Sequence, residues 1–361
     1  MPNNQAHDPR VATAGERVAQ PVGLSVAAVA SGAAGVTGTW LEGQTLTISS
    51  DGVNGFGSGA YREELFDDFA GKTPGATQQT TDKTGGLGSY KDGGGLFSDA
   101  YSHSKGVSLK QFDDATSFFN ITRLVLSQST QVFCTSYWVF VPTGKALPGM
   151  SVDSYTPGGS NWKLSWAFAA EPDTAGSPDI CLPSNNGTDA LTLDGNESSM
   201  ADFGNHANLS TVHTYGEWMW VYVLVDGVNG EFRVKYLSQS KGLFQYSKSF
   251  ADLWGTTSPQ YFAEWQYPGF VQNAANCEMY YDDVSVHAGP AAGGLVLIGN
   301  ASTLAACTEL SIQRISSRSD SSIAISAQLG PFASFAGTYL FVLDQLGSPV
   351  AYEGAEGRLI A

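Results

Sequence analysis

Two short segments of this 361-residue chain combine aromatic rings with amide and carboxylate groups. Proteins bind sugars by stacking their apolar faces on aromatic side chains, while carboxylates and amides take the hydroxyl groups. The candidate residues for such binding are Trp162, Trp166, Tyr261, Glu264, Trp265, Gln266 and Tyr267. Large aromatic residues at alternate positions also fill the core of a β-sandwich, so core packing is the competing interpretation of the same rings.

Two pairs of adjacent aspartates form a second candidate site. Asp67 and Asp68 lie in one strand-like segment, and Asp282 and Asp283 lie in another, more than two hundred residues later. If the two strands are neighbours, four carboxylates gather at one edge, which is costly unless a cation or hydrogen bonds neutralise them. A structural Ca²⁺ ion is therefore a candidate ligand, and no other cofactor is expected. The alternative is that these side chains cap turns and face water.

The residue types that catalysis needs do not form a recognisable constellation. The chain has five histidines, which are His7, His103, His206, His213 and His287. We interpret His206 and His213 as ordinary surface residues of a polar loop, and Glu264 and Glu278 as isolated carboxylates. Motifs for serine hydrolases, nucleotide binding and zinc peptidases are absent from the sequence. We therefore predict that the protein is not an enzyme.

Composition narrows the fold and the partners. The chain has 42 glycines, 12% aromatic residues and only 14% charged residues, which is typical of many short strands joined by tight turns. Its net charge is −16 and its Lys and Arg residues do not cluster, so nucleic acid is not an expected partner. The apolar stretch of residues 23–38 is too short and too rich in glycine for a membrane span. We expect a soluble protein that does not use a secretory signal.

Four cysteines lie far apart, without a C-x-x-C pair, and are expected to be buried free thiols. They are Cys134, Cys181, Cys277 and Cys307. Residues 1–20 are polar and lack any hydrophobic period, which predicts an N-terminal arm.

The elements that must position the candidate residues are β-strands. Residues 231–237 (EFRVKYL) alternate apolar and charged side chains, which predicts a strand with one wet face. It should form a hairpin with residues 218–225 (WMWVYVLV) through a turn that contains glycine. That second strand and residues 137–141 (YWVFV) have no polar face, so both of their faces must be covered. The predicted fold class is all-β, with two stacked antiparallel sheets.

The two terminal parts of the sequence together predict a smaller β-domain, which is formed by two segments that are separated in the sequence. Residues 24–50 supply too few strands for a core, and the four strand-like runs of residues 294–350 are also short of a sandwich. A split domain resolves both deficits. We therefore divide the chain into an arm (1–20), a split domain (21–59 plus 290–361) and an inserted domain (60–289).

The segments also carry a family resemblance. The first piece (GQTLTI, then GFG) and the last piece (RISSRSDSSIAI, then GTYLFVLD) resemble the opening and closing strands of an IPT/TIG immunoglobulin-like domain. The insert resembles the concanavalin-like lectin/glucanase jelly roll through its opening LFDDF, its WMWVYVLVDGVNGEFRVKY hairpin and its closing YYDDVSV. The resemblance implies an immunoglobulin-like β-sandwich that is interrupted by a larger concanavalin-like sandwich. Similar jelly rolls often carry structural calcium.

This arrangement resembles bacteriophage virion structural proteins, and the resemblance implies the functional expectations. The chain would be a non-enzymatic protein of the virion surface, made in the host cytoplasm, that decorates the capsid or works as a tail adhesin. Its immunoglobulin-like base and arm would bind other virion proteins, as a homo-oligomer on the particle, while the jelly roll contacts host glycans.

Two alternatives stay open. One is a polysaccharide-degrading enzyme, a glycosidase or a lyase, although residues 64–71 (ELFDDFAG) lack the final acid of the E-x-D-x-x-E order of related laminarinases. The other is a structural cement protein that binds no sugar.

Overall fold

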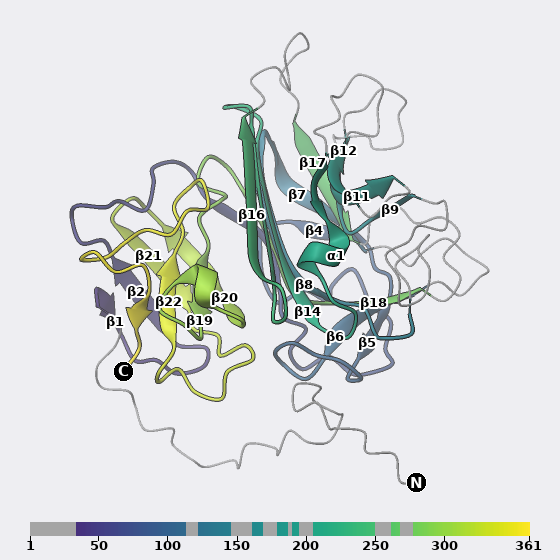
Figure 1. The fold of residues 1–361 in the computed structure, drawn as a ribbon, viewed down its shortest axis with the longest axis horizontal. Coiled ribbons are helices and arrows are strands. Elements are labelled where there is room, and N and C mark those ends of the chain that lie inside the picture. Colours follow the sequence, from purple (N-terminus) through teal and green to yellow (C-terminus); the bar gives the residue numbers. More distant parts are fainter. Residues whose placement is uncertain are drawn as a thin grey trace.

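The computed structural model describes residues 34–112, 122–145, 161–168, 179–186, 190–194, 205–249, 261–267 and 277–361. These residues form two β-rich parts that lie side by side (Figure 1). Within these ranges the helical elements are one turn of α-helix, α1 (Leu209–Val212), and one 3₁₀ turn, η1 (Leu304–Ala306). The predicted all-β fold class is confirmed. The predicted N-terminal arm lies outside the described residues.

The smaller part, which we call the base, is built on a seven-stranded antiparallel sheet with the order β1-β2-β21-β20-β19-β22-β23. Its strands are β1 (Val36–Thr37), β2 (Thr45–Ser49), β19 (Val296–Gly299), β20 (Leu310–Arg318), β21 (Ser322–Ser326), β22 (Tyr339–Val342) and β23 (Arg358–Leu359). Strand β2 pairs with β21 over its whole length, from Thr45 opposite Ser326 to Ser49 opposite Ser322. Strands from the two ends of the chain therefore share one sheet, and the larger part interrupts it.

The larger part, which we call the insert, contains two eight-stranded antiparallel sheets. The base-side sheet has the order β16-β15-β14-β8-β18-β6-β5, with β3 also paired to β18. Its strands are β3 (Arg62–Asp67), β5 (Leu96–Ser98), β6 (Ser108–Phe112), β8 (Val132–Phe140), β14 (Trp218–Asp226), β15 (Glu231–Ser238), β16 (Gly242–Ser249) and β18 (Glu278–Ala288).

The outer sheet has the order β13-β12-β11-β10-β17-β7-β4, with β9 also paired to β11. Its strands are β4 (Ser89–Asp92), β7 (Thr122–Thr130), β9 (Asn161–Lys163), β10 (Trp166–Phe168), β11 (Asp179–Asn186), β12 (Ala190–Asp194), β13 (Asn205–Asn208) and β17 (Phe262–Tyr267). The division of the chain at residues 59/60 and 289/290 stays a prediction.

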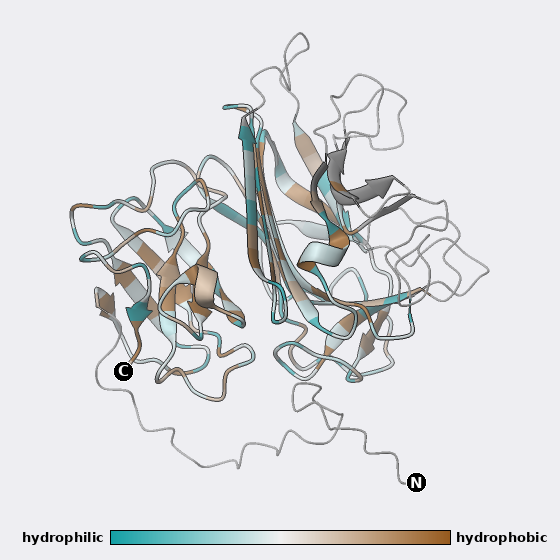
Figure 2. Ribbon diagram, in the orientation of Figure 1, coloured by the Kyte–Doolittle hydropathy of each residue, from teal (hydrophilic) through white to brown (hydrophobic). Residues whose placement is uncertain are grey.

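Three hydrophobic cores hold these layers together. One lies between the two sheets of the insert, a second between the base-side sheet and the base, and the third inside the base. Figure 2 shows hydrophobic residues concentrated on the strands, most clearly in the base. The base therefore covers the back of the base-side sheet, while the outer sheet lies on the far side of the sandwich (Figure 1).

Strand β14 explains why this stack needs a run of apolar residues without a polar face. Val221 and Val223 pack between the insert sheets, whereas Trp220 and Tyr222 pack against the base. Both faces of the strand are therefore covered, as predicted from its sequence. The predicted hairpin with β15 is also confirmed, since residues 219–226 pair in continuous register with residues 231–238.

The hairpin turn has a local cause in Asp226. Its Oδ1 accepts hydrogen bonds from the backbone N–H groups of Val228 and Asn229, at 3.0 and 2.9 Å. In such a turn the aspartate side chain accepts hydrogen bonds from the backbone of the next residues, and these bonds stabilise the reversal of the chain. The turn ends at Gly230, whose φ of 65° lies in the left-handed region that glycine adopts at low cost.

The predicted wet face of β15 is wrong at Lys235. The strand alternates as expected, but Lys235 is only 6% exposed, because the base lies over this part of the sheet. Its ammonium group donates a hydrogen bond to Gln245. Burial lowers the pKa of Lys235 to about 8. The alternation identified the strand but could not show that a second domain covers its charged face.

Cys134, Cys277 and Cys307 are buried free thiols, as predicted. The side chain of Cys181 lies outside the described residues. Within the described ranges, the helices are too short or too polar to cross a membrane.

Candidate functional site

Strand β17 places two of the predicted polar residues on the outer face of the sandwich. Trp265 and Tyr267 belong to the core between the insert sheets, so Glu264 and Gln266, which alternate with them, lie on the opposite face. The neighbouring strand β7 adds Arg123, which is the register partner of Gln266. These side chains form a polar row across the outer sheet, on the face that is turned away from the base.

Glu264 is the charged centre of this row. Its Oε1 lies 3.1 Å from the ammonium group of Lys91, and its Oε2 lies 3.8 Å from Arg123 Nη1. The carboxylate side chain is only 6% exposed, whereas Lys91 is 48% exposed. The ionic partners that the fold gives Glu264 are therefore two cations, one of which reaches into solvent.

Gln266 supplies an acceptor that the protein leaves unused. The residue is 3% exposed, and its Oε1 has no hydrogen-bond partner among the described residues. Buried polar atoms are nearly always hydrogen-bonded, and an unpaired acceptor costs about 1–3 kcal/mol. A hydroxyl group of a ligand at this face would satisfy Gln266 Oε1. The role that the sequence predicts for Gln266 and Glu264, hydrogen bonding to a sugar, stays a prediction.

The two rings of β17 do not take part in this face. Trp265 and Tyr267 are fully buried, and their ring centroids lie 4.7 Å apart. The Tyr267 hydroxyl lies 2.9 Å from that of Tyr90, inside the core. The prediction that Trp265 and Tyr267 stack on sugar is therefore wrong, because the register of β17 points both rings between the sheets. The competing interpretation, core packing, holds for these two residues.

The other predicted rings have different positions. Tyr261 directly precedes β17 and is 51% exposed, so its ring is accessible at the end of this strand. Trp162 lies on β9 and Trp166 on β10, where Trp166 is the register partner of Gln266. The side chains of Trp162 and Trp166 lie outside the described residues, so their predicted role stays a prediction.

The aspartate pairs are brought onto neighbouring strands but not into one site. Strands β3 and β18 pair as expected, with Asp67 opposite Val284. However, the described residues contain no group of three His, Cys, Asp or Glu side chains that could hold a metal ion. The predicted gathering of Asp67, Asp68, Asp282 and Asp283 around a Ca²⁺ ion is therefore wrong for this part of the chain. Each pair is satisfied instead by donors of the protein.

Asp67 and Asp68 accept hydrogen bonds from other residues of the insert. Tyr90 donates its hydroxyl to Asp67 Oδ2 over 3.0 Å, and the Thr84 hydroxyl lies 3.2 Å from Asp67 Oδ1. Asp68 Oδ1 lies 2.9 Å from the same Thr84 hydroxyl and accepts a bond from the Ala70 backbone. Burial raises the pKa of Asp67 to about 7, against the lowering effect of its hydrogen bonds.

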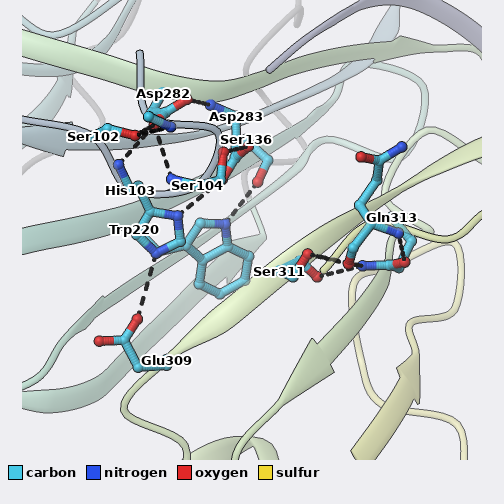
Figure 3. Close-up of polar contacts among 12 residues, drawn as sticks. Ser102, His103, Ser104, Ser136, Trp220, Asp282, Asp283, Glu309, Ser311 and Gln313 are labelled. Atoms are coloured by element: carbon cyan, nitrogen blue, oxygen red, sulfur yellow. Dashed lines mark hydrogen bonds and ion pairs between the residues drawn. The ribbon is translucent and has the colours of Figure 1, made fainter. Parts of the chain in front are cut away.

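Asp282 and Asp283 face a different loop because β18 contains a bulge. Its register with β8 shifts between Asp282 and Ser285, and Asp283 has a φ of 47°. Aspartate is one of the few non-glycine residues that tolerate this left-handed conformation. The bulge turns both side chains toward residues 102–104, as Figure 3 shows.

The loop of residues 102–104 satisfies both carboxylates. Asp282 Oδ2 accepts the backbone N–H groups of His103 and Ser104, at 2.7 and 3.1 Å. Asp283 Oδ1 accepts the Ser104 hydroxyl at 2.7 Å. Burial and the neighbouring Asp283 raise the pKa of Asp282 well above its ordinary value.

His103 is the centre of this second cluster, and it joins the insert to the base (Figure 3). Its Nδ1 lies 2.9 Å from Asp283 Oδ2, and its Nε2 lies 3.5 Å from Glu309 Oε2, which belongs to the loop before β20. The imidazole stacks on Trp138, with ring centroids 3.8 Å apart. Burial lowers the pKa of His103, but the hydrogen bond to Asp283 and the negative charges of Asp283 and Glu309 outweigh it and raise the pKa to about 9.

Sequence reasoning missed this cluster because its members are scattered and follow no motif. The surface interpretation of His213 was also wrong, since the residue is 1% exposed and burial lowers its pKa to about 3. His287 is equally buried, with its pKa lowered to about 3 by burial. His7 and the side chain of His206 lie outside the described residues.

Comparisons with known proteins find structural similarity at low sequence identity. No family model and no curated protein matches this chain. Among solved structures, lectin II from Ulex europaeus is 11% identical with a TM-score of 0.36, over 60% of this chain and 99% of the lectin. The CBM2 module of the Lactobacillus casei BL23 phage J-1 evolved Dit is 9% identical with a TM-score of 0.37, over 64% and 97%.

A lectin from Bauhinia forficata, solved in complex with GalNAc, is 10% identical with a TM-score of 0.35, over 70% of this chain and 98% of the lectin.

Proposed function

We propose that this chain is a non-enzymatic, sugar-binding protein of a phage virion surface, and that the outer sheet of the insert carries its glycan-binding face. The observation behind the proposal is the polar row of Lys91, Arg123, Glu264 and Gln266, in which Gln266 Oε1 is buried without a hydrogen-bond partner among the described residues. A hydroxyl-rich ligand supplies both the donors and the acceptors that such a row requires. Tyr261 offers an exposed ring at the edge of the same strand.

The arrangement of the layers supports a role in display. The base packs on the base-side sheet through a hydrophobic core, and the polar row lies on the other sheet of the sandwich. A particle bound to the base would therefore lie on the opposite side of the sandwich from the polar row. In this proposal the base is an IPT/TIG-type domain, and it attaches with the N-terminal arm to other virion proteins, as a homo-oligomer on a capsid or a tail.

The surroundings of Glu264 support binding without cleavage in this proposal. Glycoside hydrolysis uses two carboxyl groups, one as acid and the other as nucleophile or base. The ionic partners that the described fold gives Glu264 are Lys91 and Arg123, both cations. Charge-assisted hydrogen bonds of this kind are short and strong, so they hold the Glu264 carboxylate in a fixed position for a ligand.

A glycan array with the full-length protein tests the proposal, together with an assay for released reducing ends. The variants are Gln266→Ala and Glu264→Gln, and the matched control is Gln128→Ala, an exposed residue of β7 in the same sheet. We expect retention of at least one glycan class without cleavage. Each site variant should lose about tenfold or more in affinity, because a partner of the ligand hydroxyls is removed.

Three outcomes would contradict the proposal. Released reducing ends or unsaturated products would make the protein an enzyme. An empty array, with loss of particle stability when the protein is deleted, would make it a structural cement protein. Glycan binding that survives both site variants while they keep the melting temperature of the wild type would place the sugar elsewhere.

A further inference from the structure

A cavity of about 500 Å³ lies between the base and the insert, on the opposite side of the base-side sheet from the glycan face. The insert contributes the start of β3 and the loop of residues 86–87, and the base contributes β20. Its lining includes Arg62, Glu63, Leu87, Arg314, Ser317 and Arg318. Ligand sites commonly occur between domains and have volumes of about 300–1,000 Å³.

Cations dominate this cavity in a chain whose net charge is −16. Arg62 comes from the insert and pairs with Glu64 over 2.9 Å. Arg314 and Arg318 come from the base, and all three arginines line the same space, where Arg318 has no carboxylate partner among the described residues. Arg318 is held in place, since it donates hydrogen bonds to the backbone carbonyls of Gly294, Phe56 and Leu343. The charge of the cavity therefore favours a ligand that carries an anionic group.

Arg314 presents the group that suits such an anion. Its Nε donates to Glu63 Oε1 over 2.9 Å, which leaves the Nη1 and Nη2 edge of a side chain that is 36% exposed. A Cβ atom on Gly85 would lie 2.3 Å from Arg314 Nη2, so the glycine leaves room for the guanidinium to lie against the backbone. An arginine fixed in this way can hold a carboxylate through two parallel hydrogen bonds.

Glu63 adds an acceptor that has no partner. Its Oε2 is buried and accepts no hydrogen bond among the described residues, while Oε1 is used by Arg314. An unpaired buried carboxylate oxygen calls for a donor, such as a hydroxyl group of a ligand. Ser317 offers an exposed hydroxyl in the same lining, and Leu87, which is 62% exposed, offers an apolar surface.

We propose that this interdomain cavity is a second saccharide site and that it binds an acidic sugar of the hexuronic acid type. The sugar carboxylate pairs with the free edge of Arg314, and a ring hydroxyl donates to Glu63 Oε2. Leu87 covers an apolar face of the ring, and Ser317 binds a second hydroxyl. Because the insert and the base each supply part of the lining, the bound sugar also fastens the two parts to each other.

Calorimetric titration of the full-length protein tests this site with four defined sugars. D-galacturonate and D-glucuronate are compared with D-galactose and D-glucose, which lack the carboxylate but keep the other ring hydroxyls. The variants are Arg314→Gln, which removes the carboxylate partner, and Ser317→Trp, which fills the cavity. The matched control is Ser247→Trp, an exposed position on β16.

We expect saturable binding of a uronate, with the neutral sugar of the same configuration about tenfold weaker or more. Both cavity variants should weaken uronate binding by a similar factor, and Ser247→Trp should not. If Arg314→Gln lowers the melting temperature, Ser317→Trp provides the test, because the Ser317 substitution removes no side-chain hydrogen bond among the described residues. Equal affinity for the acidic and neutral sugars, or uronate binding that survives Ser317→Trp, would overturn the site.

The outcome is independent of the glycan face on the outer sheet. Uronate binding that is lost in Glu264→Gln but kept in Ser317→Trp would assign the acidic sugar to the outer sheet and refute the cavity. Conversely, an empty glycan face would leave uronate binding in the cavity intact.

Discussion

The contribution of His103 to the stability of the protein should fall as the pH rises from about 6.5 to 9. The pKa of this imidazole is about 9 in the folded protein, against about 6.5 in an unfolded chain. A pKa that is raised on folding contributes its full stabilisation below the unfolded pKa and loses it as the pH rises through the folded pKa. The difference of about 2.5 between the folded and unfolded pKa of His103 corresponds to about 3–4 kcal/mol of unfolding free energy, since one pKa unit is about 1.4 kcal/mol.

The structural reason for this loss is the position of His103 between two carboxylates. Deprotonation removes the positive charge that Asp283 and Glu309 share, and it leaves the buried Asp283 beside Asp282 without its cation. Because Glu309 belongs to the base, the loss should also weaken the contact between the base and the insert.

Denaturant unfolding at a series of pH values measures the effect in the wild type and in His103→Gln. Glutamine retains hydrogen-bonding groups but cannot carry the charge, so the pH dependence between 6.5 and 9 should be flatter in the variant. His287→Gln is the matched control, because the pKa of the buried His287 is lowered to about 3 and the ring stays neutral over this range. Equal slopes in the wild type and in His103→Gln would refute the reasoning.

Three further predictions test the other buried groups. The carboxyl of Asp67 has a pKa of about 7 in the folded protein and about 3.9 in the unfolded chain, so its contribution to the free energy of unfolding falls as the pH rises from about 4 to 7. Asp67→Asn should flatten this part of the stability curve, as measured by denaturant unfolding, and an unchanged slope would contradict the burial of Asp67. Trp265→Ala should cost about 3–5 kcal/mol in thermal unfolding, whereas Tyr261→Ala should change stability by less than about 0.5 kcal/mol, and equal effects would contradict the placement of the two rings. Removal of Ca²⁺ with a chelator should leave the melting temperature unchanged, because donors of the protein already satisfy both aspartate pairs, and a clear drop in that temperature would revive the calcium site.

The features that the sequence predicted best are those that depend on local periodicity. The alternation of residues 231–237 and the apolar run of residues 218–225 identified the central hairpin, including the covering of both faces of β14. Such patterns report the period of a strand directly. They could not show which domain lies over a face, and so Lys235 was expected in water although the base covers it.

The candidate site was less predictable, because it depends on which face of a strand a residue occupies. Glu264 and Trp265 are adjacent in sequence, yet one lies on the outer face and the other in the core. A shift of one residue in register would exchange them. His103 and Glu309 lie 206 positions apart, so only the packing of the base on the insert could bring them together.

The pairing of β3 with β18 means that the chain leaves the base and returns to it at almost the same place. The backbone of Ala291 donates to the carbonyl of Ala60 over 3.1 Å, directly beside these two strands. A different module could therefore replace residues between them, in evolution or by grafting, without altering the path of the base. The replacement module must have an apolar surface that faces the base. Without it, Leu297 and Phe341 would lose the packing that Trp220 and its neighbours provide.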